Sequence, residues 1–486
     1  MNKNDEIFNK VLEEIIPTSQ ELIQIEKIVD LIRSLLTERA KQLNIEFNSI
    51  EPQGSTGIKQ TQLRDDFDID IFIGLDFNKY LDNFNSLSKT KFKKLVKRDF
   101  LNLCNEWIIK SLTSEEFKDP KLLYAEHPYV KVNYVKDNLK IDLDIVLYFD
   151  LDLKFIRKNG PITAVDRTPW HGRFIRDRLT DVQKNQVRLL KQLFKACHSY
   201  GDMSAVGKVG FIGYSAELLI YYLHDITKVM ENFDKLDNLD NIILDHFNRD
   251  KMKLENIKHF QNDHLLIIDP IDKNRNVGSA ISEKAYKFCK YKINEFLQNP
   301  SKEFFKIKEI PLFHPNKNRD ILNQFFILEF ESIDEDTHYT EKRDKLYSLG
   351  EDIKIHAEKE YSHEERFGNI YFEVYFQPKI KEFNLALFCN NPKISPTYIR
   401  RGPPLKKGKH VKRFKQKNSN YFEKNGYLWV EEKREFWDFI VFLKQFVQGK
   451  IPESLQCINI TNSEDVKTRS GKKALYVLQN WVLPFI

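Results

Sequence analysis

The chain has 486 residues, with 77 basic against 71 acidic residues and a formal net charge of +6. Hydrophobic residues make up 41% and charged residues 30%, which fits a globular protein of about three domains. No apolar run approaches the ~20 residues of a membrane-spanning helix, and the N-terminus lacks the apolar core of a signal peptide. The five cysteines show no CxxC spacing, which argues against a disulfide framework or a structural zinc site and favours a cytoplasmic protein.

Helices are predicted at the start of the chain. Between residues 5 and 45, apolar residues recur three or four apart from Leu22 to Leu36, as on an amphipathic helix, and Pro17 divides the segment into two helices. The next predicted elements are strands at 47–51 and 67–75 with a GSTG turn between them that opens a short helix, a helix at 93–111, and a hairpin of strands 129–135 and 139–149.

Residues 54–70, GSTGIKQTQLRDDFDID, join a Gly-Ser turn to two aspartates at i and i+2, Asp68 and Asp70. Side chains at i and i+2 of a strand point to the same face, so these two carboxylates are expected to converge. Converging carboxylates repel unless a cation lies between them, and Mg²⁺ prefers oxygen ligands that it shares with substrate phosphates. The run therefore predicts metal-assisted chemistry on a nucleoside triphosphate.

A second acidic strand follows in the sequence LKIDLDIVLYFD, where Asp142 and Asp144 alternate with apolar residues. A lone acidic strand is usually a solvated face. Beside a strand that is already acidic, a third carboxylate is better explained by metal binding. Either Asp142 or Asp144 can supply it, and we favour Asp144.

The remaining predicted elements are helices at 181–198, 214–223, 226–262, 280–298 and 435–447, and strands at 325–332 and 369–377. A basic run without acidic residues covers 400–417, and a local basic patch is typical of nucleic-acid binding. The alternative is a solvated loop. The RNA-binding candidates in this run are Arg400, Arg401, Lys406, Lys407, Lys409, Lys412 and Arg413.

The Gly-Ser turn, the Asp-x-Asp pair and the later aspartate resemble the nucleotidyltransferase superfamily that includes DNA polymerase beta. Seven further segments, in order along the chain, resemble one branch of it, the class I (archaeal-type) CCA-adding tRNA nucleotidyltransferases. These segments are EHPYV at 126–130, AVDRTPWH at 164–171, VRLLK at 187–191, YG at 200–201, KVGFIGY at 208–214, DPIDKNRNV at 269–277 and RGPPL at 401–405.

The resemblance implies an α+β protein with a polymerase-beta-like head built on a mixed sheet, a helical neck, an α/β body and a tail. In this chain these parts are expected at residues 1–150, 151–265, 266–390 and 391–486. The implied reaction is template-independent addition or repair of the 3′-terminal CCA of tRNA from CTP and ATP. Pyrophosphate leaves, and two Mg²⁺ ions assist. A cytoplasmic homodimer is implied as well.

The resemblance also assigns roles to single residues. Asp68, Asp70 and Asp144 are expected to hold the metal ions. The expected nucleotide-binding residues are Gly54, Ser55, Lys59, Thr168, His171, Lys191, Tyr200 and Arg275, with Arg275 reading the base. The alternatives are an exposed lysine for Lys59, a structural histidine for His171 and a solvated helix face for Lys191. Asp272 is expected to be a turn residue.

The chain departs from the family pattern at several places. The loop from Ser55 to Thr61 is one residue longer, Gln62 stands where tryptophan is common, and Asp142 stands where glutamate is usual. Two other functions share part of the pattern. One is a related nucleotidyltransferase that makes oligoadenylate or cyclic nucleotides, and the other is an RNA-binding protein without catalytic activity.

Overall fold

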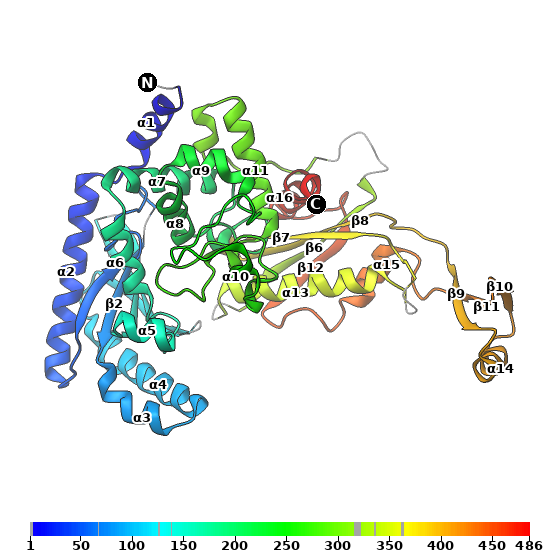
Figure 1. Ribbon diagram of the computed structural model, residues 1–486, viewed down its shortest axis with the longest axis horizontal. Coiled ribbons are helices and arrows are strands. Elements are labelled where there is room, and N and C mark those ends of the chain that lie inside the picture. The colour runs from blue at the N-terminus through cyan, green and yellow to red at the C-terminus, as the bar shows by residue number, and fades with distance from the viewer. Residues whose placement is uncertain are drawn as a thin grey trace. The chain divides into compact units, whose positions relative to one another are not determined.

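A computed structural model describes residues 3–66, 68–124, 127–137, 139–314, 322–334, 337–360 and 364–486 (Figure 1). The chain forms two compact units. Unit 1 comprises Met1–Cys197, Phe211–Ile281 and Lys290–Lys306, and unit 2 comprises His198–Gly210, Ser282–Cys289 and Ile307–Ile486. Within the described ranges, no helix is both long and apolar enough to cross a bilayer.

Unit 1 is built around a five-stranded sheet with the order β1-β2-β5-β4-β3. Strand β2 is parallel to β5, whereas the other neighbouring strands are antiparallel, so the predicted mixed sheet is confirmed. The strands are β1 (Ser49–Gln53), β2 (Ile69–Leu75), β3 (Phe117–Tyr124), β4 (Pro128–Lys136) and β5 (Leu139–Phe149). The hairpin of β4 and β5 is confirmed, and β3 is an edge strand that the sequence did not indicate.

The alternation of β2 and β5 separates an apolar face from a polar one. Residues such as Ile71 and Ile145 are fully buried in a core with helices α2 (Ser19–Gln42) and α4 (Lys89–Leu103). Because neighbouring strand residues face opposite sides, Asp70 and Asp144 lie on the other face of the sheet.

The division of the N-terminal segment at Pro17 is confirmed. Helix α1 (Lys3–Ile15) ends before it, and α2 begins behind the N-cap residue Thr18. Thr18 and Glu21 form a capping box: the Glu21 amide donates to the threonine hydroxyl, and the Thr18 amide donates to the Glu21 carboxylate.

The other helices up to residue 298 are α3 (Leu81–Ser86), a π-helix at Cys104–Ile109, α5 (Leu153–Asn159), α6 (Thr168–Arg178), α7 (Asp181–Ala196), α8 (Gly213–Leu223), α9 (Ile226–Asn232), α10 (Lys251–Glu255) and α11 (Glu283–Gln298).

The prediction of a helix over 226–262 is largely wrong, because only α9 and α10 are α-helical there. Asx side chains explain the difference. Asn238 accepts the amide of Asp240 at 2.9 Å, and Asp245 accepts the amide of Phe247 at 3.2 Å. Such bonds give the backbone an alternative to the helix.

Unit 2 contains an antiparallel four-stranded sheet, β12-β6-β8-β7, against which helices α13 and α16 pack (Figure 1). A smaller sheet, β10-β11-β9, carries α14. The elements are β6 (Phe325–Ser332), α13 (Tyr339–Glu358), β7 (Ile370–Gln377), β8 (Glu382–Cys389), β9 (Thr397–Pro404), α14 (Gly408–Lys417), β10 (Tyr421–Lys424), β11 (Tyr427–Lys433), α15 (Phe439–Phe446), β12 (Leu455–Asn462) and α16 (Arg469–Val477).

Candidate active site

The carboxylates meet in one row across the sheet of unit 1. Asp70 of β2 is paired in register with Asp144 of β5, Gln53 of β1 pairs with Asp70, and Lys131 of β4 pairs with Asp144. Asp68 lies one residue before β2 and is exposed. The two aspartates that the sequence places about 70 residues apart are therefore direct neighbours.

The row concentrates negative charge. Burial, together with the charges of Asp68 and Asp144, raises the pKa of Asp70 to about 7. Burial raises the pKa of Asp144 to about 6, against the attraction of Lys131. The Oδ1 atom of Asp144 is buried and has no hydrogen-bond partner in the described part of the chain. A cation between these carboxylates would relieve their repulsion and occupy the orphaned oxygen, so the donor set fits a divalent ion.

The ligand set is not complete as the side chains stand. Among the residues that the structure describes, no three His, Cys, Asp or Glu side chains are close enough to hold one ion together. The fit to a metal therefore rests on the electrostatics and register of Asp70 and Asp144.

Asp142 differs from Asp144 in its surroundings. Its side chain is 50% exposed and lies 3.4 Å from the Lys131 ammonium, as in a surface ion pair. Asp144, in contrast, is the residue in register with Asp70. This contrast supports Asp144 as the third carboxylate.

The Gly-Ser segment between β1 and β2 forms turns over residues 54–59 and no helix, so the expected short helix is wrong. Gly54 has a φ of 69°, a left-handed conformation that interrupts a right-handed helix and suits glycine. A Cβ at Gly54 would lie 2.2 Å from Oδ2 of Asp70. The turn and the carboxylate row are thus in contact, with Ser55 next in the chain and its carbonyl accepting the Thr61 amide at 2.9 Å.

Three buried charges fix the end of this turn. Lys59 donates to Oε2 of Glu217 at 2.7 Å, and Lys191 lies 3.4 Å from Oε1 of the same carboxylate. Lys191 also donates to the carbonyl and the hydroxyl of Thr61, at 3.1 and 2.9 Å, and Thr61 donates to Glu217 at 2.7 Å. Burial lowers the pKa of Lys191 to about 8, although Glu217 acts to raise it. Neither lysine lies on a solvated face, which contradicts the two alternatives.

A second cluster surrounds Asp269. His171 of α6 contacts Oδ2 of this carboxylate at 2.8 Å, Arg275 contacts the same atom at 2.9 Å, and Tyr214 donates to Oδ1 at 3.1 Å. Although burial alone raises the pKa of Asp269, His171 and Arg275 hold it well below its usual range. The His171 and Tyr214 rings stack with centroids 4.4 Å apart, and the Lys59 ammonium lies 4.8 Å from the Tyr214 ring centroid. The cluster therefore adjoins the turn at residues 54–59.

Thr168 and Tyr200, two of the expected nucleotide contacts, lie outside both clusters of buried charges. Thr168 is the first residue of α6 and is partly exposed. Tyr200 belongs to unit 2, whereas the other expected nucleotide contacts belong to unit 1. Asp272 accepts the Asn274 amide at 3.0 Å, as expected of a turn residue, and also pairs with Arg167 at 2.7 Å.

Sequence reasoning gave no role to Glu217, Tyr214 or Asp269. Tyr214 and Asp269 lie inside the segments that carry the resemblance. Glu217 had a detectable signal, since it is the one acidic residue in the apolar helix GYSAELLIYYL, and buried carboxylates are almost always paired.

The basic run of unit 2 divides into β9 and α14. Arg400 is partly buried and donates to Glu432 at 2.8 Å, and Arg401 lies over the Tyr427 ring. Lys415 pairs with Glu423 at 3.1 Å. The other RNA-binding candidates are exposed and form no ion pair with any described residue: Lys406, Lys407, Lys409, Lys412 and Arg413.

Comparisons with known proteins agree with the sequence motifs. Residues 185–306 match the family model described as tRNA nucleotidyltransferase, second domain. The CCA-adding enzyme of Saccharolobus solfataricus is 28% identical over 467 residues, covering 94% of this chain and 96% of the relative. That of Methanococcus maripaludis is 28% identical over 486 residues, covering 97% and 98%.

Among solved structures, a cytoplasmic RNA terminal U-transferase matches at a TM-score of 0.44 and 15% identity, covering 64% of this chain and all of that one. The full-length relatives and the matched domain point the same way: the chain is similar to CCA-adding enzymes over 94–97% of its length, and its residues 185–306 match a tRNA nucleotidyltransferase domain.

Proposed function

We propose that this protein adds or repairs the 3′-terminal CCA of tRNA without a template, using CTP twice and ATP once and releasing pyrophosphate. The observation that carries the proposal is the contact between the Gly54 turn and the Asp70–Asp144 pair, in a chain that matches CCA-adding enzymes over 94–97% of its length. A phosphate-binding turn against paired carboxylates is the arrangement that nucleotidyl transfer requires, because positioning and charge neutralisation supply most of its catalysis.

We assign two Mg²⁺ ions to Asp68, Asp70 and Asp144. When bound, the ions supply Lewis-acid activation of the attacking 3′-hydroxyl and neutralise charge on the leaving pyrophosphate. The chain's own part is to hold these carboxylates close together, while the charges of Lys131 on β4 and Lys59 on the turn partly offset the rise in the pKa of Asp70.

The backbone amides of the turn at Gly54 and Ser55 grip the triphosphate, since successive amides form a concavity suited to anions. Lys59 and Lys191 add positive charge behind the turn and hold its geometry through Thr61 and Glu217. Tyr200 contacts the sugar, in keeping with its family position.

Base selection falls to the cluster around Asp269. The Arg275 guanidinium is held by Asp269 and its side chain is 31% exposed, so part of its planar fork remains available for directional hydrogen bonds to a base. His171 belongs to this cluster, and Thr168 begins the same helix, α6; we assign both to contact with the nucleotide.

The tRNA is held in part by the basic run of β9 and α14. Its exposed cations suit the RNA backbone, and an enzyme that accepts every tRNA has to recognise shape and phosphates more than sequence. The division into head, neck, body and tail at about residues 150, 265 and 390, the cytoplasmic location and the homodimer are kept as parts of this proposal, from the family resemblance.

The test uses a tRNA that ends at its discriminator base, supplied with CTP, ATP or both and resolved on a sequencing gel. CTP alone should extend the RNA by two nucleotides, and both nucleotides together by three. A protein that ignores the tRNA and consumes ATP alone would make oligoadenylate or cyclic nucleotide synthesis the better assignment. Binding without extension would favour an RNA-binding protein.

A further inference from the structure

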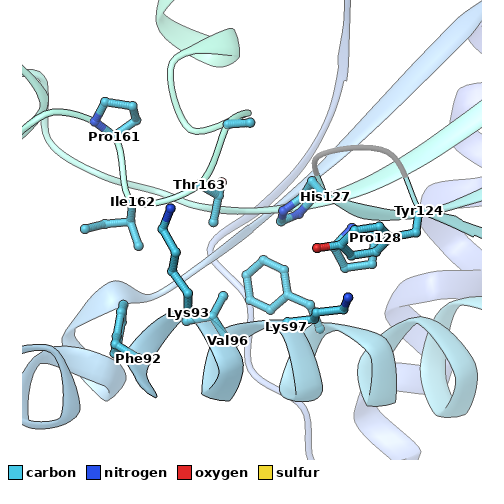
Figure 2. Close-up of a pocket in the computed structure, with 12 residues that line it drawn as sticks. Phe92, Lys93, Val96, Lys97, Tyr124, His127, Pro128, Pro161, Ile162 and Thr163 are labelled. Atoms are coloured by element: carbon cyan, nitrogen blue, oxygen red, sulfur yellow. The ribbon is translucent and has the colours of Figure 1, made fainter. Parts of the chain in front are cut away.

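Unit 1 has a cavity of about 520 Å³ that the proposed function leaves unused (Figure 2). It lies between helix α4, the start of β4 and the segment 161–164. Figure 2 shows Lys93 rising from α4 toward Ile162 and Thr163, with Lys97, Tyr124 and His127 on the other side. The lining residues are Phe92, Lys93, Val96, Lys97, Phe100, Tyr124, His127, Pro128, Pro161, Ile162, Thr163 and Ala164.

The cavity carries uncompensated positive charge. Lys93 and Lys97 are exposed, lie one helical turn apart on α4 and form no ion pair with any residue in the described ranges. No described lining residue is acidic. The imidazole of His127 is buried and bonded to the Leu147 carbonyl, and burial lowers its pKa, so the net charge comes from the two lysines.

An aromatic surface stands beside these charges. Tyr124 is 52% exposed, and the Lys97 ammonium lies 3.8 Å from the centroid of its ring, on one face. The ring is therefore held in place by a cation–π contact while much of it stays open. Phe92, Val96 and Phe100 are buried beneath and make the floor apolar. The cavity therefore offers an aromatic ring on which a base can stack and two ammonium groups that can bind a phosphate.

The cavity and the carboxylates lie on opposite faces of the sheet and are linked by a shared strand. Lys131 of β4 pairs with Asp144, and Pro128 of the same strand lines the cavity. Three residues of strand correspond to about 10 Å. Val165, next to the lining segment, packs with Tyr129 and Val146 on the carboxylate face of the sheet.

We propose that this cavity binds one nucleotide of the RNA acceptor, upstream of the reacting 3′ end, with its phosphate on Lys93 and Lys97 and its base against Tyr124. The inference rests on the proposed function, since it names where that RNA substrate lies. A phosphodiester is favoured over a free nucleoside triphosphate, because the latter arrives with Mg²⁺ and the described lining offers no carboxylate to receive the ion.

The test compares two double variants of α4. Lys93→Gln/Lys97→Gln removes the cavity cations, and the matched control Lys91→Gln/Lys94→Gln removes two equally exposed lysines of the same helix that do not line the cavity. Dissociation constants for a tRNA without its CCA end are measured at several salt concentrations, together with the KM for CTP. Tyr124→Ala and Tyr124→Phe are measured alongside.

The cavity variant should bind tRNA about tenfold more weakly than the control and with a shallower salt dependence, because contacts to phosphate release counterions. Tyr124→Ala should weaken RNA binding about tenfold and Tyr124→Phe should not, as expected for stacking. The KM for CTP should stay within about twofold in both double variants, since the triphosphate turn is untouched.

The proposal would be overturned if the two double variants lost the same amount of tRNA affinity, since the lysines of α4 would then attract RNA only by non-specific electrostatics. A raised KM for CTP with unchanged RNA binding would overturn it too, in favour of a free-nucleotide site. Binding is measured separately from nucleotide transfer. A wild-type protein that binds tRNA but transfers no nucleotide would therefore refute the proposed function, while the binding constants of the variants would still decide whether the cavity holds RNA.

Discussion

Glu217 offers the sharpest test of how the phosphate turn is held. Its carboxylate, with a side chain 1% exposed, lies between the ammonium groups of Lys59 and Lys191 and accepts the Thr61 hydroxyl. In the variant Glu217→Gln the shape and the Thr61 hydrogen bond are kept, but two buried cations lose their anion. We expect both stability and triphosphate binding to fall.

The magnitude follows from burial. Breaking a buried ion pair by removing one partner costs about 3–5 kcal/mol, and the retained Thr61 contact places this variant near about 3 kcal/mol at pH 7. The loss should depend on pH. Lys191 has a pKa of about 8 in the folded protein, and without Glu217 its pKa falls, because the anion that raises it is gone.

The sign is set by proton counting. Between the lowered pKa and about 8, the folded variant has released a proton that the unfolded chain still holds at Lys191. Stability then rises with pH, by up to about 1.4 kcal/mol per pH unit, and the deficit against wild type shrinks toward pH 8. The kcat/KM for CTP should decline above about pH 8 in wild type and at lower pH in the variant.

The assay measures calorimetric unfolding between pH 6.5 and 8.5, a range that spans the Lys191 pKa of about 8 and its expected fall in the variant. It also measures kcat/KM for CTP on a tRNA that lacks its CCA end. The control is Glu231→Gln, which breaks the exposed ion pair with Lys228 and should change neither measurement. The account would be refuted if the Glu217→Gln protein unfolded at the wild-type temperature and its kcat/KM declined above the same pH as in wild type. Glu217 would then not be what holds the two buried lysines.

Four further outcomes are expected. Asp70→Asn and Asp144→Asn should each lower kcat by about a thousandfold in primer-extension assays and leave tRNA affinity unchanged, because metal ligation supplies several kcal/mol of transition-state stabilisation. Apparent Mg²⁺ affinity, from titrated initial rates, should rise between about pH 6 and 7, since metal competes with protons on these two carboxyls; a flat profile would contradict their raised pKa values. Gly54→Ala should cost about 1–2 kcal/mol in backbone strain and push the Asp70 carboxylate away. The variant should therefore need a higher Mg²⁺ concentration to reach half of its maximal rate. Lys406→Gln/Lys407→Gln should weaken tRNA binding and reduce its salt slope by about 2 in a filter-binding series.

Local patterns predicted strands β2 and β5 because the signals for them are short-range. The alternation of aspartates with isoleucines specifies which face of β2 and β5 is buried, and the β4–β5 hairpin joins strands that are neighbours in sequence. The parallel pairing that puts Asp70 beside Asp144 is a long-range contact, and no local pattern encodes it. The third carboxylate was expected beside the first acidic strand from the chemistry of the two strands and from the family resemblance.

The buried charge clusters were out of reach for a different reason. Glu217, Lys191 and Thr61 come from three separate parts of the chain. Lys191 and Thr61 each look like a surface residue, and the apolar helix around Glu217 signals a buried carboxylate without naming its partners. Only tertiary packing removes water from them and makes their mutual contacts decisive. The α4 cavity is similar, because Lys93 and Lys97 are ordinary helix-surface lysines until Tyr124 and the segment 161–164 lie opposite them.

The extra residue between Ser55 and Thr61 has a physical place in the structure. Gln60 has a φ of 55°, so the chain makes a left-handed bend there, one residue after the turn that meets Asp70. Arg188 then clamps the bend, donating to the carbonyls of Gln60 and Gln62 at 2.7 and 2.9 Å. The guanidinium thereby satisfies one buried and one partly buried carbonyl of the longer loop. The bend lies outside the Gly54 turn, so the length difference leaves the contact between the turn and Asp70 intact.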